Sequence, residues 1–191
     1  MLKSEYLTEE DLKDFGFKSI GKNVRISSDA RIYGQENISI GNDVRIDDFC
    51  ILSAVNGFID IGNYVFIARN SHLSGFYGIT LRDFSSMAAN TVIYSASDDY
   101  SGDYLTAQAI PQEYTSHIGG PVEIGKHVII GSSSTIIGPC NIGEGCSLGA
   151  MTLAQNDLQP WGIYVGVPCR RLKERKKGLL ELEKKFLQSL E

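Results

Sequence analysis

Aliphatic residues recur at every sixth position along most of this chain, and this repeat restricts the fold more than any other feature. Ile40, Ile46 and Leu52 form one group of three, and four more complete groups and one pair have the same spacing. The seventeen positions, all Ile, Leu or Met, are 20, 26, 32, 40, 46, 52, 61, 67, 73, 81, 87, 93, 124, 130, 136, 142 and 148. Self-similarity at a short fixed period is typical of solenoid proteins.

Small or β-branched residues form a second series, four positions after most members of the first. In the group just described, Val44 and Cys50 hold these places. Residues two apart on a strand share a face, so Val44 and Ile46 are expected to point inward together. Six residues then make one short strand and one corner, and three such sides close a coil of eighteen residues. The pattern predicts an all-β solenoid with three sides and an aliphatic core.

The spacing between groups locates the insertions. Successive groups begin 20, 21, 20, 43 and 18 residues apart, and any excess over eighteen follows the third repeat residue of a group. Insertions are therefore predicted to leave the solenoid at one corner. The interval of 43 residues predicts a long inserted loop at about 94–121. Long loops on a rigid scaffold are common sites of function.

The segments on either side of the repeat have helical patterns. Thr8 precedes three acidic residues, which is typical of a helix N-terminus. The tail has apolar residues at helical spacing, at positions 179, 182, 186 and 190. We expect a helical cap at 1–17, a β-helix at 18–168 and an amphipathic C-terminal helix at 169–191.

Composition excludes several classes of function. The net charge is −5, which argues against a nucleic-acid partner. No apolar run approaches the ~18 residues of a membrane span, and the first residues lack a signal-peptide core, so we expect a cytoplasmic protein without membrane insertion. The four cysteines include no Cys-Xaa-Xaa-Cys pair, so we expect no metal site of that kind.

The steps of the repeat resemble a known family. Ile-Gly-Asn-Xaa-Val-Xaa-Ile, as in residues 61–67, is similar to the hexapeptide repeat of the left-handed parallel β-helix acyltransferases. The similarity covers about 18–175. It implies a left-handed coil, coenzyme A (CoA) as the acyl carrier, with acetyl-CoA the expected donor, and a homotrimer with active sites between subunits. Some proteins with this fold are not acyltransferases, so function has to be argued from the site.

The inserted loop carries the main acceptor-site candidates, Asp98 and Asp99. The segment Ile93-Tyr-Ser-Ala-Ser-Asp98 is similar to a stretch of the galactoside and maltose O-acetyltransferases that ends in a catalytic histidine, so Asp98 replaces that histidine. A solvated carboxylate with a pKa near 3.9 is a weak base for a hydroxyl, whereas it can hold a sugar amine through a charge-assisted hydrogen bond. The loop also resembles that of bacterial acyltransferases of nucleotide-linked 4-amino-4,6-dideoxy sugars. Alternatively, the two aspartates only shape a turn.

Two further residues are candidates for proton transfer. Glu123 lies where the loop rejoins the coil, although its position favours a plain surface role. His117 lies inside the loop and is the main alternative general base.

The donor-site candidates lie near the end of the repeat. Gly166-Val-Pro-Cys-Arg170 resembles the segment that ends the β-helix in CoA-dependent members, where cations meet the phosphates of CoA. The resemblance implies phosphate contacts from Arg170 and Lys173, and pantetheine contacts at Ser132 and Ala150. The family's Thr-Lys pair after the last coil is replaced here by Ala154-Gln155, so the part of the phosphate contact that this pair makes in the family is not expected here.

Three hypotheses of function follow. The first is a CoA-dependent acyltransferase that N-acetylates a nucleotide-linked amino sugar used for surface polysaccharide such as lipopolysaccharide O-antigen. The second is a sugar O-acetyltransferase that uses His117 as base. The third, from another class, is a non-catalytic β-helix scaffold or binding module.

Overall fold

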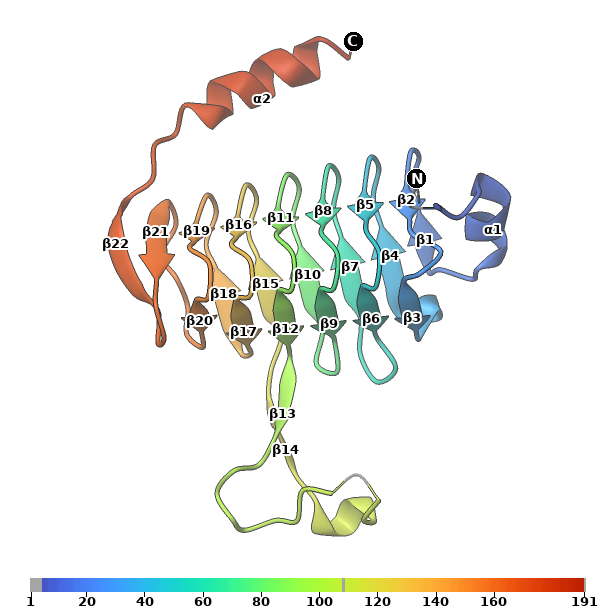
Figure 1. Ribbon diagram of the computed structural model, residues 1–191, viewed down its shortest axis with the longest axis vertical. Helices are drawn as coiled ribbons and strands as arrows, with labels where there is room; N and C mark the ends of the chain where they lie inside the picture. The colour runs from blue at the N-terminus through green and yellow to red at the C-terminus, as the bar shows by residue number, and fades with distance from the viewer. Residues whose placement is uncertain (1–4, 108, 191) are drawn as a thin grey trace.

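The chain forms a three-sided solenoid of about seven turns (Figure 1), with a helix at each end of the described chain. The computed structural model describes residues 5–107 and 109–190. Each side is a sheet of short strands stacked along the solenoid axis. The first sheet contains, in order, β1 (Ser19–Ile20), β4 (Ile38–Ile40), β7 (Ile59–Ile61), β10 (Ile79–Leu81), β15 (Val122–Ile124) and β18 (Cys140–Ile142).

The other two sheets repeat this arrangement with later parts of each coil. The second contains β2 (Arg25–Ile26), β5 (Arg45–Ile46), β8 (Phe66–Ile67), β11 (Ser86–Met87), β16 (Ile129–Ile130), β19 (Ser147–Leu148), β21 (Gly162–Val165) and β22 (Arg170–Glu174). The third contains β3 (Arg31–Tyr33), β6 (Ile51–Ser53), β9 (His72–Ser74), β12 (Val92–Tyr94), β17 (Thr135–Ile137) and β20 (Leu153–Ala154). All pairs between the described strands of successive coils are parallel, whereas β22 pairs antiparallel with β21 at the end of the second sheet. The predicted left-handed parallel β-helix is confirmed.

The repeat residues stack in register and form the core. Ile46, for example, lies between Ile26 of the preceding coil and Ile67 of the next. All seventeen positions are buried except Ile20 and Ile32, which are half-buried. These two belong to the first coil, which has a neighbouring coil on one side only.

The inserted loop leaves the third sheet after β12 and rejoins the solenoid at β15. Its stem is a two-stranded antiparallel ribbon of β13 (Ala96–Asp98) and β14 (His117–Gly119), which projects from the body of the prism (Figure 1). A 3₁₀ turn at Gln112–Tyr114 lies within the loop, and another at Gln35–Asn37 lies in a shorter insertion. All these insertions follow strands of the third sheet and so leave from one corner.

The N-terminal helix α1 (Glu9–Asp14) begins where the sequence predicted. Thr8 is its N-cap: the Thr8 hydroxyl accepts a hydrogen bond from the Asp11 amide at 3.1 Å, and the Asp11 carboxylate accepts one from the Thr8 amide. This reciprocal arrangement satisfies two backbone donors that the helix itself cannot pair.

The C-terminal segment differs from the predicted helix at 169–191. Arg170–Glu174 forms strand β22, and helix α2 covers only Leu179–Gln188. The strand is favoured because β21 leaves a free edge that the chain can pair with immediately after its turn. Helix α2 then runs back over the corners between the first and second sheets (Figure 1), where Glu183 contacts His127 at 2.8 Å and the Phe186 ring meets that of Tyr64.

Within the described residues, neither helix combines the length and apolar character needed to cross a membrane.

Candidate active site

Asp98 and His117 face each other across the stem of the inserted loop. They are paired residues of β13 and β14, and their side chains meet with 3.4 Å between Asp98 Oδ1 and His117 Nδ1. They are nineteen positions apart in the chain, and the antiparallel ribbon brings them together. Both side chains are partly buried, 36% and 25% exposed respectively. The pair joins a carboxylate to an imidazole, the two groups needed to orient an acceptor and to move a proton.

The base of the stem is held rigidly on the solenoid. Ser95 is fully buried; its hydroxyl donates to the Ser74 carbonyl at 3.0 Å and accepts from the Tyr77 amide at 2.9 Å. Gly119 crosses directly over the Ser95 carbonyl with φ of 148°, and a Cβ at this position would collide with that oxygen. Two chain segments cross so closely at this point that glycine is required. The crossing fixes the base of the ribbon that carries Asp98 and His117.

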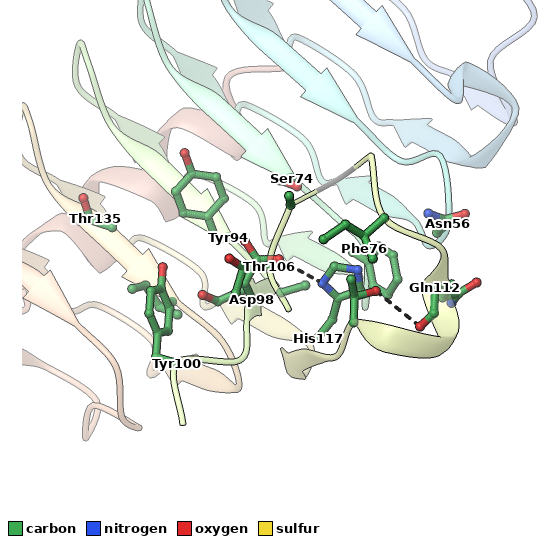
Figure 2. Close-up of a pocket in the computed structure, with 16 residues that line it drawn as sticks. Asn56, Ser74, Phe76, Tyr94, Asp98, Tyr100, Thr106, Gln112, His117 and Thr135 are labelled. Carbon is green, nitrogen blue, oxygen red and sulfur yellow. Dashed lines mark hydrogen bonds and ion pairs between the residues drawn. The ribbon is translucent and has the colours of Figure 1, made fainter. Parts of the chain in front are cut away.

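A cavity of about 920 Å³ lies between the loop and the edge of the third sheet. Figure 2 shows Asp98 and His117 near its middle. Ser74, Tyr94 and Thr135 line it from strands β9, β12 and β17. The cavity is large enough for a drug-sized or larger ligand. None of the described residues that line it is Lys or Arg.

The two ends of the cavity differ in composition. Figure 2 shows Tyr100 and Thr135 at one end, and Asn56, Phe76 and Gln112 at the other. This direction follows the order of the third sheet, in which β17, β12, β9 and β6 are successive neighbours. The cavity thus spans about three strand spacings, or ~14 Å.

Asp99 lies outside the lining of this cavity. Its carboxylate accepts a hydrogen bond from the Ser101 amide at 2.6 Å, and hydrogen bonds from Ser101 hold the pKa of the Asp99 carboxyl below its usual value. This is an Asx-type turn, so the carboxylate is engaged in shaping the loop.

Glu123 is also outside the cavity. It lies on β15 in the first sheet, and its Oε1 accepts at 2.9 Å from Nε of Arg82, which directly follows the neighbouring strand β10. Both side chains are about half exposed, so this is a surface ion pair between two coils, of the kind that adds little to stability.

Three of the expected donor-site residues, Ser132, Ala150 and Arg170, lie at the corner between the second and third sheets. Ser132 and Ala150 are exposed on successive coils of that corner, where the Met151 amide donates to the Ser132 carbonyl at 2.9 Å. Arg170 lies beside the same corner, because the adjacent Cys169 amide donates to the Leu153 carbonyl at 2.8 Å. Lys173 is further along β22, opposite Ile163.

The donor corner and the cavity border the same sheet. Ser132 stands three residues before Thr135, which lines the cavity from β17. A molecule that lies along Ser132 and Ala150 can therefore reach the Thr135 end of the cavity without crossing an edge of the prism. Within residues 5–107 and 109–190, no group of three or more His, Cys, Asp or Glu side chains is placed to hold a metal ion.

The sequence did not single out several residues that line the cavity. Asn56, Phe76 and Gln112 come from three separate segments, and the repeat provides no signal for any of them. The three residues share one property, which is that each belongs to an insertion that leaves the solenoid at the same corner. This property predicts the region of the site but does not identify individual residues in it.

Comparison with known proteins agrees with this geometry. No protein-family model matches the chain. The chain is 45% identical over 181 residues to the dTDP-4-amino-4,6-dideoxy-D-glucose acyltransferase of Escherichia coli, covering 95% of this chain and 94% of that protein.

Solved structures give the same result. AntD, an N-acyltransferase from Bacillus cereus solved in complex with dTDP and 3-hydroxybutyryl-CoA, superimposes with a TM-score of 0.94 and 46% identity, over 98% of this chain and 99% of that one. A maltose O-acetyltransferase from Clostridium difficile has a TM-score of 0.56 at 22% identity, over 93% of this chain and 80% of that one, and shares the fold alone.

These similarities confirm the resemblance that the hexapeptide repeat indicated, and they rule out the non-catalytic scaffold as the best description. The chain belongs to the family of β-helix acyltransferases that use acyl-CoA and act on nucleotide-linked 4-amino-4,6-dideoxy sugars.

Proposed function

We propose that this chain transfers an acyl group, acetyl by preference, from CoA to the 4-amino group of a dTDP-linked 4-amino-4,6-dideoxy sugar. The single observation that carries this proposal is the Asp98–His117 pair inside a cavity that is also lined by Thr135, three residues after Ser132 at the donor corner. The dTDP moiety is taken from the relatives, which act on it or were solved with it.

Asp98 is the residue proposed to hold the amine. Its carboxylate accepts a hydrogen bond from the amine nitrogen, and His117 supports the carboxylate from the other side at 3.4 Å. The nitrogen lone pair attacks the thioester carbonyl carbon; a C–N bond forms and the C–S bond breaks. The amine loses one proton and the departing thiolate of CoA gains one, so the products are an amide and free CoA. Asp99 and Glu123 are less suited to this role, because their carboxylates are engaged by Ser101 and Arg82.

The donor is proposed to lie along the corner between the second and third sheets. Ser132 and Ala150 offer exposed backbone there for the pantetheine arm, and the exposed cations Arg170 and Lys173 suit its phosphates. The arm then delivers the thioester to the Thr135 end of the cavity, towards Asp98.

A homotrimer is proposed as the working form. A nucleotide diphosphate needs cations, and the described lining of the cavity contains neither Lys nor Arg. A second copy can supply them, since Arg31 and Arg45 are exposed on the outer faces of the third and second sheets. Ile51 and Ile129, 37% and 41% exposed on the same faces, are apolar residues that such a contact would cover.

The nature of the proposed acceptor also suggests a biological role for the product. A nucleotide-linked amino sugar is the activated form from which surface polysaccharide is built, so the product is assigned to the synthesis of material such as O-antigen in the cytoplasm. Sugar O-acetylation stays a second candidate for one reason: a carboxylate beside a histidine is also the pair that activates a hydroxyl.

Thiol release from acetyl-CoA tests the proposal directly. Wild-type protein is mixed with acetyl-CoA and either dTDP-4-amino-4,6-dideoxyglucose or the matching 4-hydroxy sugar nucleotide, and free CoA is measured. We expect turnover with the amine and a rate at least a hundredfold lower with the hydroxyl. Turnover of the hydroxyl alone would establish the O-acetyltransferase instead. Turnover of neither, together with no thermal shift by CoA, would refute both.

A further inference from the structure

Arg175 fastens the C-terminal strand to a corner of the solenoid that is not the donor corner. Its Nη1 donates to three backbone carbonyls, those of His127 at 2.7 Å, Gly145 at 3.1 Å and Cys146 at 3.2 Å. These carbonyls belong to two successive coils, at the corner between the first and second sheets. The Arg175 amide also donates to the Trp161 carbonyl at 2.7 Å, on the next level of the same corner. One residue therefore joins the chain to three levels of the solenoid.

Strand β22 needs such a fastening because it is the last strand of the second sheet. Its neighbour in the sheet is β21, and the pairing of the two strands shifts register between Ile163 and Tyr164. All five residues of β22 are exposed. A strand that is paired along one edge, exposed and interrupted by an irregularity opens readily from an end that is not held.

The two ends of β22 lie at opposite corners of the second sheet. Figure 1 shows β22 beside β21 at the end of the solenoid, leading on to α2. The strand begins with Arg170 at the donor corner and runs antiparallel to β21 as far as Glu174, opposite Gly162. Arg175 is five positions beyond Arg170, or ~16 Å at the rise of an extended strand. Any effect of Arg175 on a ligand at Arg170 therefore has to pass through the strand.

We propose that Arg175 is a positioning residue for the acyl donor. This inference rests on the proposed function, in which Arg170 and Lys173 meet the phosphates of CoA. Arg175 fixes the far end of β22 and so holds both cations in place before the donor arrives. Less of the binding free energy is then lost in ordering them. Arg175 itself does not touch the donor, because its guanidinium faces the carbonyls of the other corner.

Helix α2 is a second element that could hold the strand. Glu183 of α2 contacts Lys126 and His127, so the helix is docked at the same corner as Arg175. Gly178 lies between Arg175 and the helix, and open space surrounds the position that its Cβ would occupy. Since this link is not packed against the solenoid, we expect the docking of α2 to hold β22 less firmly than Arg175 does.

Calorimetric titration of the full chain with CoA tests the role of Arg175. We expect Arg175→Ala to raise the Kd for CoA about fivefold, at the lower end of the usual coupling between two sites, and to leave the Kd for dTDP unchanged. Arg175→Lys keeps the charge but not the planar guanidinium, so its Kd should lie between the two, and it replaces the alanine variant if that variant does not fold. Arg82→Ala removes an exposed arginine from the surface pair with Glu123 and is the matched control, with no expected change.

A multiple-variant cycle shows whether Arg175 acts through the cations of β22. In a chain that already carries Arg170→Ala and Lys173→Ala, Arg175→Ala should raise the Kd for CoA less than about twofold, because no cations remain to be positioned. An undiminished rise in that background would mean that Arg175 contributes independently, and it would overturn the proposal. An equal rise in Glu183→Gln would also overturn it, since the docked helix would then be what holds the strand.

Steady-state kinetics separates positioning from a general loss of structure. Arg175→Ala should raise KM for acetyl-CoA about fivefold, while kcat and KM for the nucleotide sugar stay within about twofold of wild type. Equal weakening of CoA and dTDP binding would indicate general disruption, and CoA binding like that of wild type would show that the strand needs no such anchor. Either result would overturn the proposal and leave the acyl transfer standing. Failure of wild type to bind CoA at all would instead count against the proposed function.

Discussion

Replacing Asp98 by Asn removes a charge while it keeps the size and one acceptor oxygen. A hydrogen bond to a charged group contributes ~1.5–3 kcal/mol and a neutral one ~0.5–1.5 kcal/mol, so the expected loss is ~1–1.5 kcal/mol. The Asp98 side chain is 36% exposed, and solvent screening puts the loss near the lower end of this range. We therefore expect kcat/KM for the amino-sugar nucleotide to fall about five- to tenfold.

Replacing His117 by Ala should cause a small loss of activity if the acceptor is an amine and a large loss if it is a hydroxyl. If the acceptor is an amine, His117 only steadies the Asp98 carboxylate across the stem, and its loss should cost about threefold, the effect of one weak polar contact. If the acceptor is a hydroxyl, His117 is the general base, and its loss should cost ~10²–10⁴-fold.

The assay is thiol release at saturating acetyl-CoA, with the nucleotide sugar varied for wild type and both variants. Asp103→Asn serves as the matched control, because Asp103 is an exposed carboxylate of the same loop outside the lining of the cavity. A loss of more than a hundredfold in His117→Ala beside near-normal Asp98→Asn would refute the assignment of Asp98 as the amine-binding residue.

Four other outcomes can be measured independently. Ile67→Ala, in a fully buried stack, should lower the free energy of unfolding by ~2–5 kcal/mol in a denaturant titration. Burial raises the pKa of Glu183, but hydrogen bonds from Lys126 and His127 outweigh it and lower the pKa; the stability that this pair gives should be present above pH ~4.5 and lost as pH falls further, and Glu183→Gln should flatten that loss in pH-dependent melting. Arg170→Ala should weaken CoA binding several-fold at low salt and less at high salt. Light scattering should give three times the chain mass if the trimer is correct.

The fold could be predicted because every coil repeats the same sequence pattern. An aliphatic residue at each sixth position places one buried side chain on each strand, and a shift of one residue in register would turn the whole series of side chains outward. Ile20 and Ile32 show the limit of this reasoning, since a periodic pattern does not reveal that an end coil lacks one neighbour. Strand β22 shows another: Arg170–Glu174 has a helical neighbourhood in sequence, and only the open edge of β21 makes it a strand.

The site was accessible to sequence only where a resemblance supplied the role. Asp98 could be proposed from its neighbours in the chain, and His117 from its residue type, but nothing in the sequence indicated that the two are opposite each other in a ribbon. Asp99 illustrates the converse. It is adjacent to Asp98 and carries the same side chain, but it follows the end of β13, and its carboxylate accepts a hydrogen bond from the Ser101 amide in a local turn.

The position of the insertions explains why the cavity residues that the sequence did not single out lie together. A solenoid side cannot change length without breaking the stack on both neighbours, whereas the corner after the third sheet already accepts insertions after β3, β6, β9 and β12. Asn56, Phe76, Asp98 and Gln112 all belong to those insertions. The proposed donor contacts, Ser132 and Ala150, belong to uninterrupted coils, where the repeat constrains the backbone. The lining of this cavity can therefore change in this fold without disturbing either the core or the proposed donor corner.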